Sequence, residues 1–132
     1  MFNSLHEECG VFGIFENKTT YVAHSAYLAL YALQHRGQES CGIAVNDDGV
    51  FRHHRGDGLV PDVFTSEKLD TLGTGNMAIG HVRYSTTGGK SVNNIQPLVI
   101  RHIKGNLALA HNGNLVNAHD IRKTFELKGG IF

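Results

Sequence analysis

The chain has 132 residues, which suits one domain, and 41% of them are hydrophobic while 18% are charged, as in ordinary globular proteins. Twelve basic and twelve acidic residues give a formal net charge of zero, which offers no electrostatic basis for binding nucleic acid or an anionic membrane. No apolar run approaches the roughly 18 residues of a membrane helix, and two cysteines without a CxxC pair favour a reducing, cytoplasmic setting.

The first elements predicted are a strand and a helix. Residues 9–15 (CGVFGIF) form a short apolar run that favours a strand. A helix face is then predicted from the spacing of Val22, Ala26, Ala29, Leu30 and Leu33. Thr19 or Thr20 can cap the start of this helix, and Gly37 can end it.

The rest of the chain predicts strands followed by one helix. Residues 41–45 and 50–54 flank the turn Asn46-Asp47-Asp48-Gly49 and predict a hairpin. Further strands are predicted at residues 77–84, 98–102 and 107–111. The last helix is predicted from Asn117, a capping residue, to the glycine pair 129–130.

Cys9 is the candidate nucleophile. A thiol is a poor nucleophile until a base favours its thiolate, and a free α-amino group, with a pKa of about 7.7–8.0, is such a base. Cleavage after Glu8 would give Cys9 that amine, although a small buried core residue is the alternative for Cys9. Cys41 begins a similar run (CGIAV) without a removable leader, and we expect it in the core.

Three polar positions are candidate substrate contacts. Arg36 lies in LQHRGQE at the end of the first predicted helix, where compensation of the helix dipole is the alternative. Arg83 ends a predicted strand, and its planar guanidinium suits a substrate carboxylate, although it can also be a surface charge. Asn112-Gly113 can supply an amide and a backbone N–H to a developing oxyanion, or can form a hairpin turn.

The nine histidines do not predict a metal site. His53 and His54 are adjacent and would point to opposite faces of a strand, and no metal-binding spacing such as HExxH is present. A metal-binding module is therefore the least favoured of the functional hypotheses.

Five stretches together resemble the glutaminase domain of the amidophosphoribosyltransferases. They are CGVFGIF, LQHRGQES, GHVRYSTTG, NIQPL and LALAHNGNLVNA, and they occur in family order from Cys9 onward. The short leader ending in Glu7-Glu8 resembles the branch of the family that removes a propeptide, so residues 1–8 are assigned as propeptide and residues 9–132 as the N-terminal part of a class II glutamine amidotransferase domain.

The resemblance implies an α+β fold of the N-terminal-nucleophile hydrolase type, an αββα sandwich of four layers. It implies hydrolysis of glutamine to glutamate and ammonia, which a second domain uses to convert phosphoribosyl pyrophosphate into phosphoribosylamine at the entry to purine biosynthesis. Cys9 would be the nucleophile and its freed amine the base. Asn112 and Gly113 would form the oxyanion hole, and Arg83 would hold the α-carboxylate of glutamine, as the family motifs imply. The motifs place Arg36 beside the nucleophile and Thr86 near the substrate.

The chain also departs from the family pattern. The acidic residue for the substrate α-amino group would fall beyond Phe132, as would the phosphoribosyltransferase domain, so we expect an incomplete fold. No cofactor is expected in this segment, whereas Mg and, in one branch, an iron–sulfur cluster would belong to the missing domain. The complete enzyme is expected to be a cytoplasmic homo-oligomer. The alternative is an inactive, uncleaved fragment that only binds or self-associates.

Overall fold

The structure, a computed structural model, describes residues 9–36, 39–84, 94–113 and 115–131. Its elements in chain order are β1 (Gly10–Thr20), α1 (Val22–Leu33), the 3-10 helix η1 (Gln34–Arg36), β2 (Ser40–Asp47), β3 (Val50–Asp57), α2 (Val60–Val63), α3 (Ser66–Leu72), β4 (Gly75–Arg83), β5 (Leu98–His102), β6 (Gly105–Leu109) and α4 (Ala118–Leu127).

Four antiparallel strands form the main sheet in the order β1-β4-β2-β3. Because β4 lies between β1 and β2, the start of β1 and the end of β4 are side by side, with Gly10 opposite Val82. The start of β2 joins them from the other side, where Ser40 is opposite Arg83. At this end of the sheet, residues near position 10 therefore lie beside residues near positions 40 and 83.

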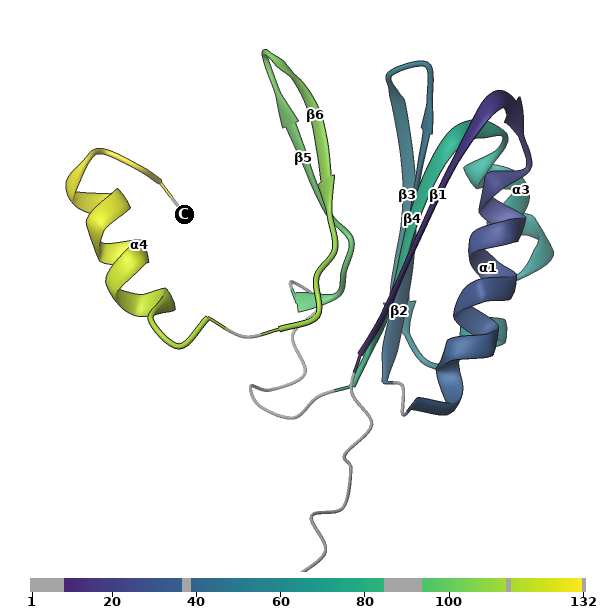
Figure 1. The fold of residues 1–132 in the computed structure, drawn as a ribbon, viewed down its shortest axis with the longest axis horizontal. Helices are drawn as coiled ribbons and strands as arrows, with labels where there is room; N and C mark the ends of the chain where they lie inside the picture. The colour runs from purple at the N-terminus through teal and green to yellow at the C-terminus, as the bar shows by residue number, and fades with distance from the viewer. Residues whose placement is uncertain (1–8, 37–38, 85–93, 114, 132) are drawn as a thin grey trace, which may run out of the picture.

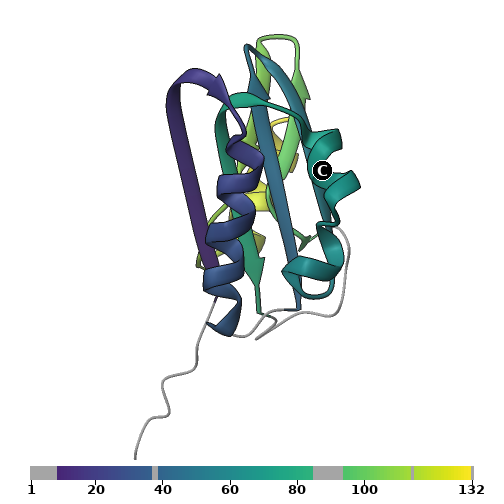
Figure 2. The same ribbon diagram turned by 90° about the vertical axis from the view of Figure 1, so that its right-hand side faces the viewer.

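Helices α1, α2 and α3 cover one face of the sheet (Figure 2). The predicted apolar face of α1 is confirmed, since Val22, Ala26 and Leu30 are fully buried and pack with sheet residues such as Ile43 and Val82. A residue spacing of three and four places these side chains on one stripe of the helix, and their burial supplies the hydrophobic stabilisation of the core.

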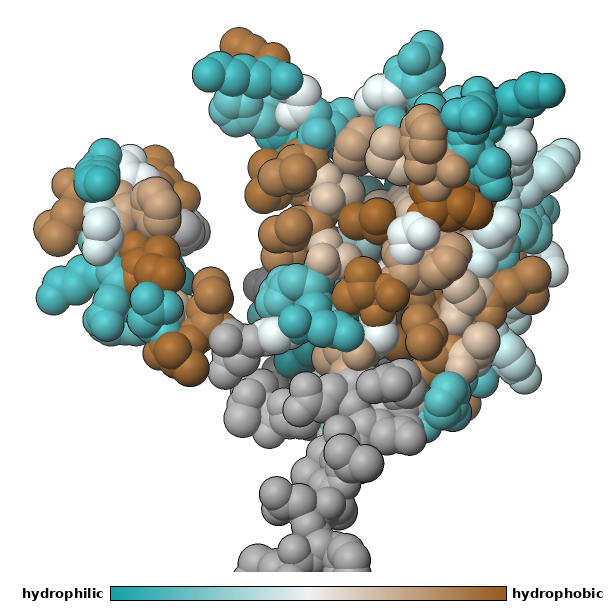
Figure 3. All heavy atoms as spheres, viewed as in Figure 1, coloured by the Kyte–Doolittle hydropathy of each residue, from teal (hydrophilic) through white to brown (hydrophobic). Residues whose placement is uncertain are grey.

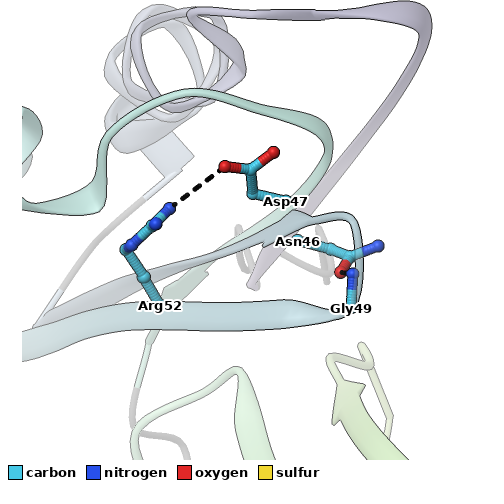
Figure 4. Close-up of polar contacts among 4 residues, drawn as sticks. All are labelled: Asn46, Asp47, Gly49 and Arg52. Carbon is cyan, nitrogen blue, oxygen red and sulfur yellow. Dashed lines mark hydrogen bonds and ion pairs between the residues drawn. The ribbon is translucent and has the colours of Figure 1, made fainter.

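The predicted hairpin of β2 and β3 is confirmed, and its turn is held by local polar contacts (Figure 4). Asp48 and Gly49 both have positive φ, 48° and 88°, as the favoured two-residue hairpin turn requires. The backbone N–H of Gly49 donates to Asn46 Oδ1 at 2.8 Å, and Arg52 pairs with Asp47 at 3.7 Å. These contacts fix the register of the two strands.

A second layer lies on the opposite face of the main sheet. The antiparallel hairpin of β5 and β6 faces the sheet, and α4 lies beyond it, so the layers follow the αββα order (Figure 1). Arg55 of β3 connects the layers, since its Nη1 donates to the carbonyl of Ile95 at 2.7 Å. Hydrophobic residues lie on α4 and on the flank of the hairpin nearest to it (Figure 3), and α4 buries none of its residues.

Some predicted boundaries were wrong. Thr19 and Thr20 do not cap α1 because both belong to β1, and Tyr21 precedes the helix without a side-chain cap. Asn117 does occupy the position before α4, but its side chain makes no capping hydrogen bond. Gly37 lies outside the described residues. The two short helices between β3 and β4 were not predicted, because they lack a long apolar period.

Candidate active site

The thiol of Cys9 lies where β1 begins and β4 ends. The backbone N–H of Tyr84 donates to Cys9 Sγ at 3.3 Å, and the carbonyl of Tyr84 lies 3.7 Å from the same sulfur. Cys9 is half-buried, so the alternative of a fully buried core residue is wrong. An N–H donor is a favourable neighbour for a sulfur that carries negative charge, while the carbonyl can accept the proton of the neutral thiol.

Asn112 reaches Cys9 from the second layer. Its Nδ2 donates to the main-chain oxygen of Cys9 at 2.5 Å, across 103 positions of sequence. A side-chain amide has two N–H groups, so one remains for a ligand after the other has bound the Cys9 carbonyl. Among the described residues, an added Cβ on Gly113 would meet no atom within 4 Å. The structure thus brings Cys9, Asn112 and Gly113 together.

The alternative for Asn112-Gly113, a tight turn between two strands, is wrong. β6 has already ended at Leu109, and the next regular element is α4. The segment carrying Asn112 is instead held by its neighbour, because the backbone N–H of His111 donates to Gln96 Oε1 at 2.6 Å. Sequence reasoning did not select Gln96, although it lies within the family motif NIQPL.

His81 also contacts this segment and was not selected from the sequence. It is fully buried, and its Nε2 lies 3.1 Å from the carbonyl oxygen of His111. Burial lowers the pKa of His81 from 6.5 to about 4; hydrogen bonding to the His111 carbonyl opposes the shift. The ring is therefore neutral at pH 7. A carbonyl only accepts, so the neutral ring carries its proton on Nε2.

Arg83 is the last residue of β4 and directly precedes Tyr84, so it lies at the same edge as the thiol. Its carbonyl accepts the backbone N–H of Glu39 at 2.7 Å, which fixes the strand end. Arg36 belongs to η1, and its side chain is outside the described part of the structure, as is Thr86. Substrate contact by these three residues remains a prediction.

Cys41 lies in the core, as predicted. It is fully buried in β2 among the hydrophobic residues beneath α1, and its sulfur lies 4.0 Å from the carbonyl of Gly58. Within the described ranges, no three His, Cys, Asp or Glu side chains are arranged to hold a metal ion. No helix in the same ranges is long and apolar enough to cross a membrane.

Comparison with known proteins gives a consistent result, although no protein-family model matches the chain. The amidophosphoribosyltransferase of Methanocaldococcus jannaschii is 52% identical over 124 residues, which cover 94% of this chain and 26% of the relative. That of Bacillus subtilis is 47% identical, covering 97% of this chain and 26% of the relative. The one from Lacticaseibacillus casei is 50% identical over 97% of this chain and 65% of its own length.

Two solved structures agree with these sequences. The structure described as the allosteric regulatory enzyme of purine biosynthesis superposes with a TM-score of 0.81 at 46% identity, covering 92% of this chain and 26% of that one. The glutamine phosphoribosylpyrophosphate amidotransferase of B. subtilis, complexed with ADP and GMP, gives a TM-score of 0.76 at 43% identity, with the same coverage.

The layer order and these superpositions define part of an N-terminal-nucleophile hydrolase fold, as the sequence predicted. The chain is homologous along almost its whole length to the amidophosphoribosyltransferases, and it spans 26% of the M. jannaschii and B. subtilis relatives.

Proposed function

We propose that this chain supplies the glutaminase site of an amidophosphoribosyltransferase and that Cys9 is its nucleophile. The observation that carries the proposal is the contact of Asn112 Nδ2 with the Cys9 main-chain oxygen, 2.5 Å long. It places an amide donor beside a half-buried thiol whose sulfur already accepts the N–H of Tyr84. A nucleophile next to preorganised donors is the arrangement that acyl transfer requires.

Activation requires removal of residues 1–8. In the unprocessed chain the nitrogen of Cys9 belongs to a peptide bond, and a peptide nitrogen cannot accept a proton at neutral pH. Cleavage after Glu8 converts this nitrogen into an α-amine with a pKa of about 7.7–8.0. That amine then takes the thiol proton and delivers it to the leaving group, so one group serves as base and acid in turn.

The reaction proceeds through a thioester. The Cys9 sulfur attacks the side-chain carbonyl carbon of glutamine, and the negative charge that develops on oxygen is stabilised by the free Nδ2–H of Asn112 and the N–H of Gly113. The C–N bond breaks, and ammonia leaves with the proton held by the amine. Water then attacks the thioester, releases glutamate and restores the thiol.

Glutamine is held by its α-carboxylate. The guanidinium of Arg83 suits this group because it can donate two parallel hydrogen bonds, and it lies one residue from the Tyr84 backbone that contacts the thiol. Arg36 next to the nucleophile and Thr86 near the substrate complete the proposed binding site, on the strength of their motifs.

The relatives' names and lengths suggest the wider role. We infer that residues 9–132 are the first part of a class II amidotransferase domain within a longer cytoplasmic chain, as coverage of 26% of the relatives supports. The ammonia would replace pyrophosphate on phosphoribosyl pyrophosphate, giving phosphoribosylamine for purine biosynthesis. Mg and any iron–sulfur cluster would belong to the later part of that chain, which would assemble as a homo-oligomer. No observation favours a module that only binds or self-associates.

Substitution of the two cysteines in the full-length protein tests the proposal. Cys9→Ala should abolish glutamate release from glutamine, because it removes the proposed nucleophilic sulfur that lies beside Tyr84. Cys41→Ala should retain it, because Cys41 is fully buried in the core of β2 among the hydrophobic residues beneath α1. Full activity in Cys9→Ala, or loss in a folded Cys41→Ala, would overturn the assignment.

A further inference from the structure

We propose that His81 is a positioning residue: its Nε2–H holds the His111 carbonyl and thereby fixes the Asn112 and Gly113 donors beside Cys9. The inference rests on the proposed glutaminase function. It assigns a task to a fully buried histidine whose ring lies against the His111 carbonyl.

His81 projects toward the second layer. In β4 its neighbours Gly80 and Val82 face the helices, because a Cβ on Gly80 would meet Leu30 of α1 and Val82 belongs to the same buried core as Leu30. Side chains alternate along a strand, so His81 lies on the opposite face, from which the segment after β6 is reached. The hydrogen bond to His111 spans 30 residues and is thus a tertiary contact between the two layers.

The peptide groups on both sides of His111 are held. Its N–H donates to Gln96 Oε1 at 2.6 Å, and its carbonyl lies 3.1 Å from His81 Nε2. The carbonyl of His111 belongs to the same planar peptide unit as the backbone nitrogen of Asn112. Fixing that carbonyl therefore sets the direction in which Asn112 leaves the segment, and with it the reach of Nδ2 to Cys9.

The His81 ring must be neutral if it is to donate to the His111 carbonyl without placing a second, buried proton on Nδ1. Its Nδ1 is buried and has no hydrogen-bond partner among the described residues, so a proton there would lack an acceptor in that part of the chain. Arg83 and His111, the charged and titratable groups that face the ring, both disfavour a positive charge on it, whereas the side chain of Asn112 favours it. Burial outweighs these contributions, and the ring stays a neutral Nε2–H donor across the physiological range.

Loss of the Nε2–H donor should affect the chemical step more than glutamine binding. Oxyanion donors act on charge that develops in the transition state, so their displacement lowers kcat, while KM depends on the α-carboxylate contact. The sulfur keeps its hydrogen bond from the backbone N–H of Tyr84, which involves no atom of His81. Its reactivity toward a small alkylating agent should therefore be preserved.

The test compares His81→Leu, which removes the donor, with His81→Gln, which retains an N–H donor on the side chain, in the processed full-length protein. We expect His81→Leu to lower kcat about 10- to 100-fold, with KM and the rate of Cys9 alkylation by iodoacetamide within about twofold of the unsubstituted protein. His81→Gln should recover most of the lost kcat. Unchanged kcat in His81→Leu, or equal losses in both variants, would overturn the proposal, as would a parallel loss of Cys9 alkylation.

Hydrogen–deuterium exchange separates this inference from the proposed function. His81→Leu should speed exchange in the peptide carrying residues 110–113 while the peptide of α1 remains protected as before. This result is expected even if the unsubstituted protein releases no glutamate, an outcome that would refute the glutaminase proposal alone. Unaltered exchange at 110–113 would refute the positioning role.

Discussion

Asn112 Nδ2 donates to the main-chain oxygen of Cys9 at 2.5 Å, although 103 positions separate the two residues. Cys9 directly precedes β1 of the main sheet, and Asn112 follows β6 of the second layer. The proposed site therefore lies where the ends of two layers meet, and its geometry depends on the contacts that hold those layers together.

Asn112→Ala should lower the kcat of glutamine hydrolysis about 100- to 1,000-fold, because it removes the proposed oxyanion donor and leaves the Cys9 carbonyl without this partner. Steady-state kinetics measures the effect. Asn117→Ala is the matched control, since Asn117 precedes α4 and its side chain makes no capping hydrogen bond. Equal kinetics in the two variants would contradict the assignment of Asn112.

Arg83→Lys should raise the KM for glutamine about 10- to 100-fold with a smaller change in kcat, because an ammonium cannot reproduce the two parallel hydrogen bonds of a guanidinium to a carboxylate. Initial rates over a range of glutamine concentrations give both constants. Arg101→Lys, on exposed β5 away from the thiol, should leave both constants unchanged. An unaltered KM in Arg83→Lys would remove Arg83 from the substrate site.

The sequence predicted the elements whose periodicity is set by burial on one face. The α1 stripe, the β2–β3 hairpin and the burial of Cys41 follow from apolar spacing and turn residues alone. The candidate site residues Cys9, Asn112 and Gly113 were selected through their motifs, and the structure brings Asn112, which precedes Gly113, into contact with Cys9.

What the sequence could not reveal depends on tertiary contacts. His81 looks like any histidine in a strand until the segment after β6 is placed against it. The role of Gln96 likewise becomes visible only in the structure, where its side chain accepts the N–H of His111, fifteen positions away. The cap at the start of α1 was misassigned because Thr20 pairs with Gly75 of β4 and therefore belongs to β1. Sheet pairing here outweighs the local capping preference of threonine.

Gly42→Ala should destabilise the protein by about 1–3 kcal/mol, because an added Cβ would overlap the carbonyl of Gln96 and press on Arg55 of β3. The displaced carbonyl belongs to Gln96, whose side chain accepts the N–H of His111, so activity should fall as well. Gly13→Ala is the control, since its nearest contact is Ile79 Cγ2 at 4.0 Å. Denaturant unfolding of both variants measures the difference, and equal midpoints would contradict the close approach.

His81 should make stability depend on pH. Its pKa is about 4 in the folded protein and near 6.5 in the unfolded chain, so between these values the unfolded state binds the extra proton. The free energy of unfolding should fall by roughly 3 kcal/mol as the pH drops from 6.5 to 4. His81→Phe should show a flatter profile over this window in denaturant titrations. Parallel profiles for the two proteins would show that His81 is not the group responsible.

The first residue of the active protein tests the central claim most directly. N-terminal sequencing of the full-length protein, combined with an assay of glutamate and ammonia release, relates processing to activity in one sample. The account predicts that the hydrolysing species begins at Cys9 and that protein blocked from cleavage after Glu8 is inactive. Release of ammonia by protein that still begins at Met1 would contradict it.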